Sequence, residues 1–348
     1  MKAKIKLSIS LFFAVFFTIS VFSQVSVIVV DDSSDNFDNT KELTSVLDSL
    51  GVEYFYFDAE QSGTPDITIM NAFDIVLWHT STWGTDLLFW DNKDEDSQLL
   101  KAYLNQPNAN LWLIGNDFMF DRYGAAPDDF GAGTFPYDYL GIKKYVAQSY
   151  GDDGNKGVPF VAPATTNPIA GLKDISWSFA TLWWADNYEI RDEAKPVYIF
   201  GGNDYPLRGG ITGLYYPRTN GSKVLTFGFD LSLAADFSIK KQTINTVLSW
   251  WNETLSGIEN PKPAKPEWGI YPTLVNADLT ITSEETFVQP IIVELISMDG
   301  IPIFTIQQNT IGLNAVNINL SAANLKSGTY LCRISTSDQV LVKRIIKL

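Results

Sequence analysis

Val25-Ser26-Val27-Ile28-Val29-Val30 is a nearly continuous apolar run near the beginning of the chain. Such a run is typical of a strand that is covered on both faces of its sheet. Residues 38–50 follow with apolar side chains at helical spacing and end at Gly51, which suits the position just after a helix. A buried strand followed by an amphipathic helix indicates the start of an α/β domain.

The alternation of strands and helices continues as far as Trp251. Helices are expected at residues 97–104 and 234–251. Further strands are expected at residues 52–57, 73–78, 111–115, 197–200, 213–216 and 224–227. This order predicts a mainly parallel central sheet, because strands joined through helices run in the same direction.

The order of elements resembles the class I glutamine amidotransferase-like fold, including its trehalose-utilisation (ThuA-like) branch. The similar segments are Asp74-Ile75-Val76-Leu77, Leu113-Ile114-Gly115 before a sharp turn, and Gly228-Phe229-Asp230 before a helix that ends in Leu248-Ser249-Trp250-Trp251. The resemblance covers residues 24–256 and implies a flavodoxin-like, mainly parallel sheet.

The nucleophile of that family is missing. Its turn after the corresponding strand carries a cysteine within Gly-x-Cys-x-Gly, whereas this chain reads Gly115-Asn116-Asp117-Phe118-Met119. The domain has no cysteine, so the amidase mechanism cannot be carried over. Asp117 can be a nucleophile or general base, but we favour a role as the N-cap of the next helix.

Other polar residues follow the expected strands, where ligands of open α/β sheets bind. His79 can act as an acid or base near neutral pH, although a hydrogen-bonded structural role is the favoured interpretation. Trp83, in the loop Ser81-Thr82-Trp83-Gly84, is expected to be exposed, and an exposed indole suits the apolar face of a sugar ring. The predicted ligand-binding residues are Asp31, Asp32, Trp83, Asn116 and Asp230.

A further set of tryptophans is considered with Trp83. Trp112 and Trp250 are expected in the core, given their places within a strand and a helix. The other candidates for an aromatic ligand surface are Trp78, Trp90, Trp177, Trp183 and Trp184.

The acidic run from Asp31 to Asp38 offers oxygen ligands that suit calcium. It lacks the full spacing of an EF-hand loop, and a solvated loop with Asp38 near the helix start is the favoured alternative. No other cofactor or metal is predicted. The net charge of −15 argues against nucleic acid as a partner, because nucleic-acid binding needs a basic surface.

Residues 1–23 read as a signal peptide. Three lysines precede the apolar run Leu7–Val21, and small side chains precede Gln24 at the expected cleavage site. The run is shorter than the about 20 residues that cross a bilayer as a helix, so a retained anchor is the less favoured alternative. We expect no membrane span after cleavage.

Residues 270–348 alternate short β-type runs with turns such as Met298-Asp299-Gly300, which predicts a small all-β, immunoglobulin-like sandwich. A Pro/Lys-rich spacer at residues 257–269 precedes it, and we expect that spacer to be extended.

This module resembles the type A sorting domain of the type IX (Por) secretion system of Bacteroidetes. The resemblance lies in Ile270-Tyr271-Pro272, Ser297-Met298-Asp299-Gly300, Leu325–Tyr330 and the tail Val342–Leu348; the usual Tyr-Pro-Asn-Pro opening reads Tyr271-Pro272-Thr273-Leu274 here. It implies recognition by the secretion machinery through residues 270–348 and a secreted or cell-surface protein. An ordinary immunoglobulin-like accessory domain is the alternative.

Two functions remain for the α/β domain. We favour a non-catalytic binding module with a carbohydrate ligand, which predicts an aromatic surface at the carboxyl edge of the sheet. The alternative is a carboxylate-dependent hydrolase of carbohydrate or peptide that uses Asp117 and His79. That alternative predicts a cleft where two titratable groups converge on one reacting atom.

Overall fold

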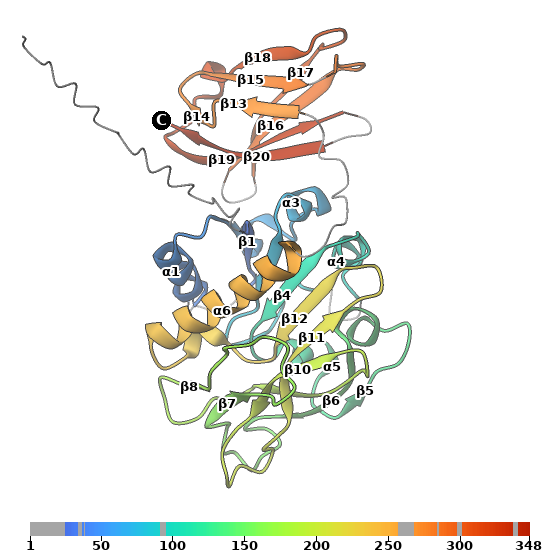
Figure 1. Cartoon of the computed structure of the whole chain (residues 1–348), viewed down its shortest axis with the longest axis vertical. Helices are drawn as coiled ribbons and strands as arrows, with labels where there is room; N and C mark the ends of the chain where they lie inside the picture. The colour runs from blue at the N-terminus through green and yellow to red at the C-terminus, as the bar shows by residue number, and fades with distance from the viewer. Residues whose placement is uncertain are drawn as a thin grey trace, which may run out of the picture.

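The computed structural model describes residues 25–33, 37, 39–90, 95–256, 268–283, 285–297, 301–336 and 340–348. The expected signal peptide, most of the spacer and the Met298-Asp299-Gly300 turn lie outside the described residues. The described chain forms an α/β domain, residues 25–256, and a C-terminal sandwich, residues 268–348 (Figure 1). Among the described helices, none is long and apolar enough to cross a membrane.

One half of the main sheet is parallel, as predicted. Its strand order is β2-β1-β3-β4-β12, and every neighbouring pair in it runs in the same direction. Every residue of β1, β3, β4 and β12 is buried. The bounds of these strands are β1 Val27–Asp31, β2 Tyr54–Asp58, β3 Ile75–His79, β4 Asn110–Ile114 and β12 Lys223–Phe227.

The other half is antiparallel, so the prediction of a mainly parallel sheet is correct only for part of it. From β12 the order continues through β11, β10, β7 and β8, while β9 and β6 branch from β11 and β5 pairs with β6. The bounds are β5 Asp128–Asp129, β6 Ile142–Gln148, β7 Phe160–Pro163, β8 Ile175–Ser176, β9 Asp186–Ile190, β10 Lys195–Phe200 and β11 Ile211–Pro217.

Short connections explain this difference. Only residues 218–222 join β11 to β12, and that turn contains Asn220-Gly221, a typical hairpin signal. Parallel neighbours need a crossover of a dozen or more residues, for which the chain has no room here.

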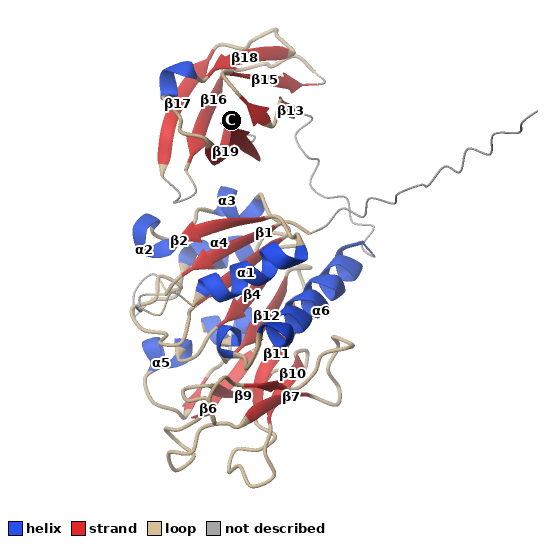
Figure 2. Ribbon diagram, turned by 90° about the vertical axis from the view of Figure 1, so that its left-hand side faces the viewer, coloured by secondary structure: helices blue, strands red, loops and turns tan. Residues whose placement is uncertain are grey.

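Helices cover both faces of the parallel half. Val27 and Val29 of β1 pack in the core cluster that contains α1 and α6, whereas Ile28 and Val30 pack in the cluster that contains α3, α4 and α5. Figure 2 shows α1 beside α6. The helical bounds are α1 Thr40–Leu50, α2 Ala59–Ser62, α3 Ile67–Asn71, α4 Gln98–Leu104, α5 Phe118–Tyr123 and α6 Phe237–Ser256, with a π-helical turn at Pro136–Leu140 and a 3-10 turn at Leu231–Leu233.

The C-terminal sandwich is all-β, as predicted. A three-stranded sheet faces a five-stranded sheet across a core that contains Ile281, Val293 and the single thiol Cys332. Burial raises the pKa of the Cys332 thiol to about 12, which agrees with the expected inert role. The bounds are β13 Trp268–Tyr271, β14 Leu274–Val275, β15 Asp278–Ser283, β16 Ile291–Ile296, β17 Pro302–Gln308, β18 Ala315–Asn319, β19 Gly328–Ser335 and β20 Val340–Lys347, with a 3-10 turn at Ser321–Ala323.

Candidate functional site

The carboxyl ends of the parallel strands meet at one edge of the sheet and carry polar side chains, as the sequence predicts. Asp31 ends β1, His79 ends β3, the turn Asn116-Asp117 follows β4, and Asp230 follows β12. All of these side chains are buried, whereas the polar side chains of ordinary solvated loops are exposed. Their hydrogen bonds therefore decide which of them can meet a ligand.

His79 lies within a buried chain of hydrogen bonds. Its Nε2 is 3.0 Å from Oδ1 of Asp230, and its Nδ1 is 2.7 Å from Oγ1 of Thr40. The Thr40 hydroxyl is also 2.7 Å from Oδ1 of Asp31. The ring of His79 thus connects two carboxylates, Asp230 directly and Asp31 through the Thr40 hydroxyl.

Asp230 is the stronger partner of this histidine. Burial alone would raise the pKa of Asp230, but the charge and hydrogen bond of His79, with hydrogen bonds from Ser232 and Thr82, hold that pKa below its usual range. The backbone N–H of Ser232 and the hydroxyl of Thr82 both donate to Asp230 at 2.8 Å. Because His79 and Asp230 are fully buried, this pair acts as a structural connection between β3 and β12.

Asp32 and Asn116 also use their polar atoms internally. Asp32 accepts from the Trp78 indole and from the backbone N–H groups of Leu88 and Phe89, at 2.7 to 2.9 Å. Burial outweighs these donors and raises the pKa of Asp32 to about 7. Asn116 accepts from the backbone N–H of Asp230 at 2.8 Å and donates to the carbonyl of Trp183 at 3.2 Å. Both residues therefore position loops around the site.

Asp117, in the turn after β4, has an unusual backbone conformation. Asp117 is the N-cap residue of α5 by position, but its φ is +65° and its side chain makes no capping hydrogen bond, so the expected side-chain cap is absent. An N-cap residue normally has extended backbone, from which its side chain reaches the first helical N–H groups. The Asp117 carboxylate instead accepts from Nε2 of Gln148 at 2.5 Å.

Gln148 joins Asp117 to a second carboxyl group, that of Asp186. The same Nε2 is 3.2 Å from Oδ1 of Asp186, and Oδ2 of Asp186 accepts from the Tyr188 hydroxyl at 3.1 Å. The Tyr145 hydroxyl approaches Asp186 as well, but without hydrogen-bond geometry. Gln148 and Asp186 are opposite each other in the antiparallel β6–β9 pair. Sequence reasoning missed both residues, since only that strand pairing brings them together.

The pKa values of both carboxyl groups, Asp117 and Asp186, are raised. Burial raises the pKa of Asp117 to about 6, against the hydrogen bond from Gln148 and with a further increase from the charge of Asp121. Burial and the charge of Asp117 raise the pKa of Asp186 well above its usual range. The Gln148 amide donates to both acids and lowers both pKa values, but burial outweighs it at each of them. Only Asp117, with 8% of its surface exposed, borders solvent.

The loop with Trp83 packs directly on this turn. A Cβ on Gly84 would lie 2.5 Å from the carbonyl oxygen of Asn116, and a Cβ on Gly115 would lie 2.0 Å from Oγ1 of Thr80. Glycine at both positions allows this close approach of the two backbones. Trp83 therefore lies beside the Asn116-Asp117 turn.

Two exposed tryptophans belong to the segments that contact this turn. Trp83 is 50% exposed, which confirms its predicted exposure, and Trp183 is 47% exposed. Trp183 and Trp184 contact the turn through their carbonyl oxygens, which accept from Asn116 Nδ2 and from the backbone N–H of Asp117. Trp183 also stacks on Tyr150 with ring centroids 4.1 Å apart.

The remaining tryptophans of the candidate set contribute differently. Trp112 is fully buried, as expected, and Trp250 is partly buried against the core. The members of the set that prove to be core residues are Trp78, Trp90 and Trp177.

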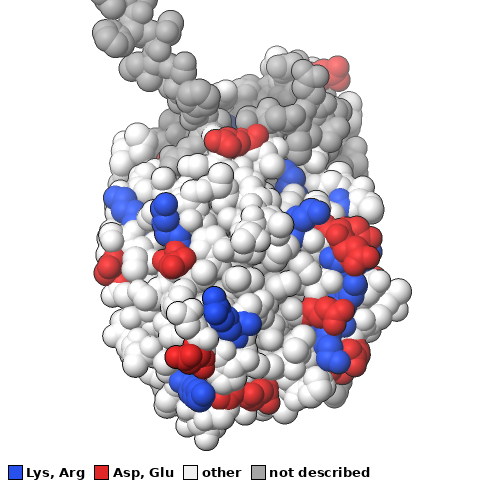
Figure 3. All heavy atoms as spheres, turned by 60° about the horizontal axis from the view of Figure 1, so that its bottom comes forward, with Lys and Arg blue, Asp and Glu red and all other residues white. Residues whose placement is uncertain are grey.

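No metal centre is visible in the described part of the chain, where no group of three or more His, Cys, Asp or Glu side chains could hold an ion. Asp35 and Asp38 of the acidic run lie outside the described residues. Figure 3 shows the end of the α/β domain far from the sandwich, where basic and acidic side chains are interspersed around uncharged surface.

A comparison with protein families decides the role of the C-terminal sandwich. The family model of the secretion system C-terminal sorting domain matches residues 269–348. These residues are a sorting domain. Such sorting domains mark proteins that the type IX system exports to the cell surface or beyond, and they are recognised by its machinery. No curated protein matches the chain.

Proposed function

We propose that the α/β domain is a non-catalytic binding module of this exported protein and that its ligand is a carbohydrate. The observation that carries the proposal is the half exposure of Trp83 and Trp183, whose chain segments both contact the Asn116-Asp117 turn. Indole faces pack on the apolar faces of sugar rings, while carboxylates and amides bind the hydroxyl groups around them. Asp117 is the polar group at this turn that borders solvent.

The burial of the other titratable groups favours binding over hydrolysis. His79, Asp186 and Asp230 are fully buried, and each is engaged in hydrogen bonds. A hydrolase needs at least two such groups within reach of one reacting atom, and these three have no access to a ligand in this conformation.

One observation favours the hydrolase as a second candidate. Asp117 combines a positive φ in a turn after a parallel strand with a pKa of about 6. Carboxyl groups with pKa values near the working pH are suited to general acid or base catalysis. In this second proposal Asp117 is the catalytic group and Asp186 tunes its pKa.

We also propose that the α/β domain is a divergent amidotransferase-like, ThuA-like domain exported with a signal peptide at residues 1–23. The parallel order β2-β1-β3-β4-β12 supports a flavodoxin-like origin for that half of the sheet. Asp117 stands in the turn that holds the cysteine of the family. The antiparallel half is then an addition to that framework.

Affinity electrophoresis of the purified protein in gels that contain single soluble polysaccharides tests the binding module. We expect retardation by at least one neutral polysaccharide. Trp83→Ala and Trp183→Ala should each weaken binding about tenfold, which corresponds to about 1.4 kcal/mol. Tyr271→Ala is the matched control, because Tyr271 is 58% exposed on the sorting domain, and it should bind normally.

The two candidate functions differ in the effect of Asp117→Asn. A binding module keeps most of its affinity and releases no reducing ends with or without the substitution. A hydrolase releases reducing ends and loses that activity in the variant. Absence of retardation by every polysaccharide tested would exclude the carbohydrate ligand.

A further inference from the structure

The five-stranded sheet of the sorting domain buries side chains on both of its faces. Val293 and Leu295 of β16 point into the core of the sandwich. Ile296 at the end of β16 and Leu331 of β19 are also buried, but they belong to the core cluster of the α/β domain, and Val342 of β20 packs against that cluster. An exposed outer face would not bury these residues, so the α/β domain covers part of this face.

Two arginines on the same outer face bind acidic residues of the α/β domain. Nη1 of Arg333 is 2.8 Å from Oδ2 of Asp66, the N-cap of α3, while Nε of Arg333 is 2.6 Å from Oε2 of Glu294 in strand β16 of the sorting domain itself. Arg344 of β20 pairs with Glu53, which precedes β2. We call Ile296, Leu331, Arg333, Val342 and Arg344 the docking face.

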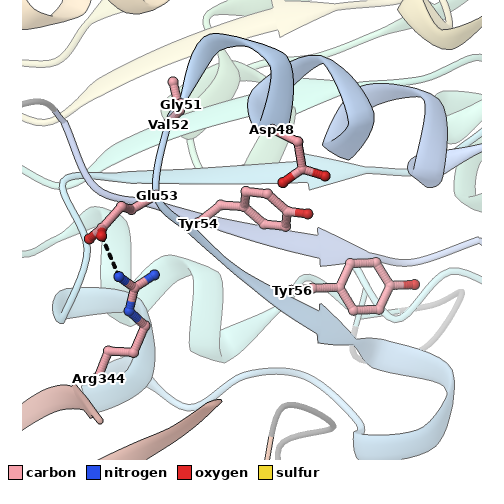
Figure 4. A pocket seen from close by; sticks show the side chains of 7 residues that line it. All are labelled: Asp48, Gly51, Val52, Glu53, Tyr54, Tyr56 and Arg344. Atoms are coloured by element: carbon pink, nitrogen blue, oxygen red, sulfur yellow. Dashed lines mark ion pairs between the residues drawn. The ribbon is translucent and has the colours of Figure 1, made fainter. Parts of the chain in front are cut away.

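The contact extends to the edge strand of the main sheet. Arg344 lines a pocket of about 450 Å³ together with Tyr54 and Tyr56 of β2. Figure 4 shows the Arg344 side chain reaching from β20 toward Glu53 at the mouth of this pocket. Strand β2 is the end strand of the sheet, so the sorting domain partly shields an edge that would otherwise be open.

The charges of the two domains are complementary. The net charge of the chain is −15, and the acidic excess lies in the α/β domain, since the basic and acidic residues from Ile270 onward nearly balance. Within the sorting domain, Arg333 and Arg344 place two positive charges at the contact, beside the single negative charge of Glu294. The acidic domain and this basic, apolar face therefore attract each other.

We propose that the docking face is a protein-binding surface of the sorting domain that the α/β domain occupies in the full chain. The sorting domain is thus held against its own cargo and is partly covered. A secretion component that binds this face must displace the α/β domain and must offer the same chemistry, acidic side chains beside an apolar patch. This inference is independent of the carbohydrate site.

The contact is suited to displacement. Its ion pairs are partly exposed, with Asp66 and Glu53 open to solvent, and exposed pairs contribute only about 0–1 kcal/mol each. The covalent connection compensates, because it gives the two domains a high effective concentration. Docking is therefore favoured in the intact chain but is weak enough for a charge reversal at one of these pairs to open it.

Small-angle X-ray scattering of the full chain tests the docking. The unmodified protein should scatter as one compact particle. The double variant Asp66→Asn with Arg344→Glu should increase the radius of gyration. It removes the ion pair of Arg333 with Asp66 and turns the attraction between positions 344 and 53 into repulsion. Asparagine at position 66 keeps the N-cap of α3, so the helix itself is preserved.

Two further variants separate docking from folding. Lys343→Glu carries the same charge reversal on a neighbouring side chain that lies over the Tyr271 ring and belongs to no docking pair, and it should leave the radius of gyration unchanged. Adding Glu53→Lys to the double variant should restore compactness, since it recreates an ion pair of opposite sense. Circular dichroism confirms that each variant is folded.

The proposal is overturned if the unmodified protein already scatters as two separated domains. It is equally overturned if the folded double variant stays as compact as the unmodified protein. A gain in the radius of gyration with Lys343→Glu as large as in the double variant would also exclude a specific docking face.

Discussion

Replacing Asp117 by asparagine should stabilise the α/β domain at neutral pH. Asp117 is 8% exposed, and burial raises its pKa from the ordinary 3.8 to about 6. The folded protein therefore holds the proton more tightly than the unfolded chain does. Stability falls as pH rises from about 4 to about 6, and the loss is complete above that window.

The size of the effect follows from the pKa difference. Each pKa unit corresponds to about 1.36 kcal/mol, so a change from 3.8 to about 6 costs about 3 kcal/mol once Asp117 is ionised. Asparagine carries no charge, so its burial does not lower the free energy of unfolding in this way. Its amide oxygen can still accept from Gln148, and asparagine tolerates the positive φ of +65° at this position.

Urea unfolding at several pH values measures this difference. Tryptophan fluorescence reports on the α/β domain, because Trp268 is the only tryptophan of the sorting domain. The variant and the unmodified protein should unfold alike near pH 4, and the variant should gain up to about 3 kcal/mol by pH 8. Asp129→Asn, a change at an exposed carboxylate paired with Lys144, is the control and should show no such gain.

An equal gain at pH 4 and pH 8 would refute the reasoning, because it would not arise from ionisation. A loss of stability at pH 8 would refute it as well and would assign the Asp117 carboxylate a structural role. A gain instead fits a residue that is kept for function at a cost in stability.

Two further substitutions test the packing around the site. His79→Gln should destabilise the domain by about 1–3 kcal/mol in thermal melts, because it removes the ring nitrogen that hydrogen-bonds to the fully buried Asp230 carboxylate; an unchanged melting temperature would contradict a structural role for this contact. Gly115→Ala should cost about 3 kcal/mol or more, since its Cβ would lie 2.0 Å from Thr80 Oγ1. Gly63→Ala, at a positive φ of +75° with open space around it, is the matched control and should cost only about 1–2 kcal/mol in the same urea titration; equal losses would contradict the close contact.

Local patterns were sufficient for much of the fold. Fully apolar runs predicted the parallel strands β1, β3 and β4, because such strands are buried on both faces. The same reasoning failed for β6 and β9, whose residues mix exposed and buried side chains and which pair across a long loop. The hairpin turn Asn220-Gly221 was a usable signal for antiparallel pairing that the strand–helix pattern obscured.

The candidate site was predicted in part for the same reason. Strand ends and a tryptophan beside a glycine are local features, so the position of Asn116-Asp117 and the exposure of Trp83 were readable. Asp117 does stand at the N-cap position of α5, but its expected side-chain cap is absent, because a sequence does not reveal a positive φ at a residue other than glycine.

The sequence by itself determined the buried parallel strands of this protein, its export signal at residues 269–348 and the absence of cysteine from its α/β domain. Only the tertiary structure decided which polar groups meet: His79 with Asp230, and Asp117 with Gln148 and Asp186. Hydrophobic periodicity is a property of neighbouring residues, whereas a buried polar contact depends on the register of strands that lie far apart in the chain.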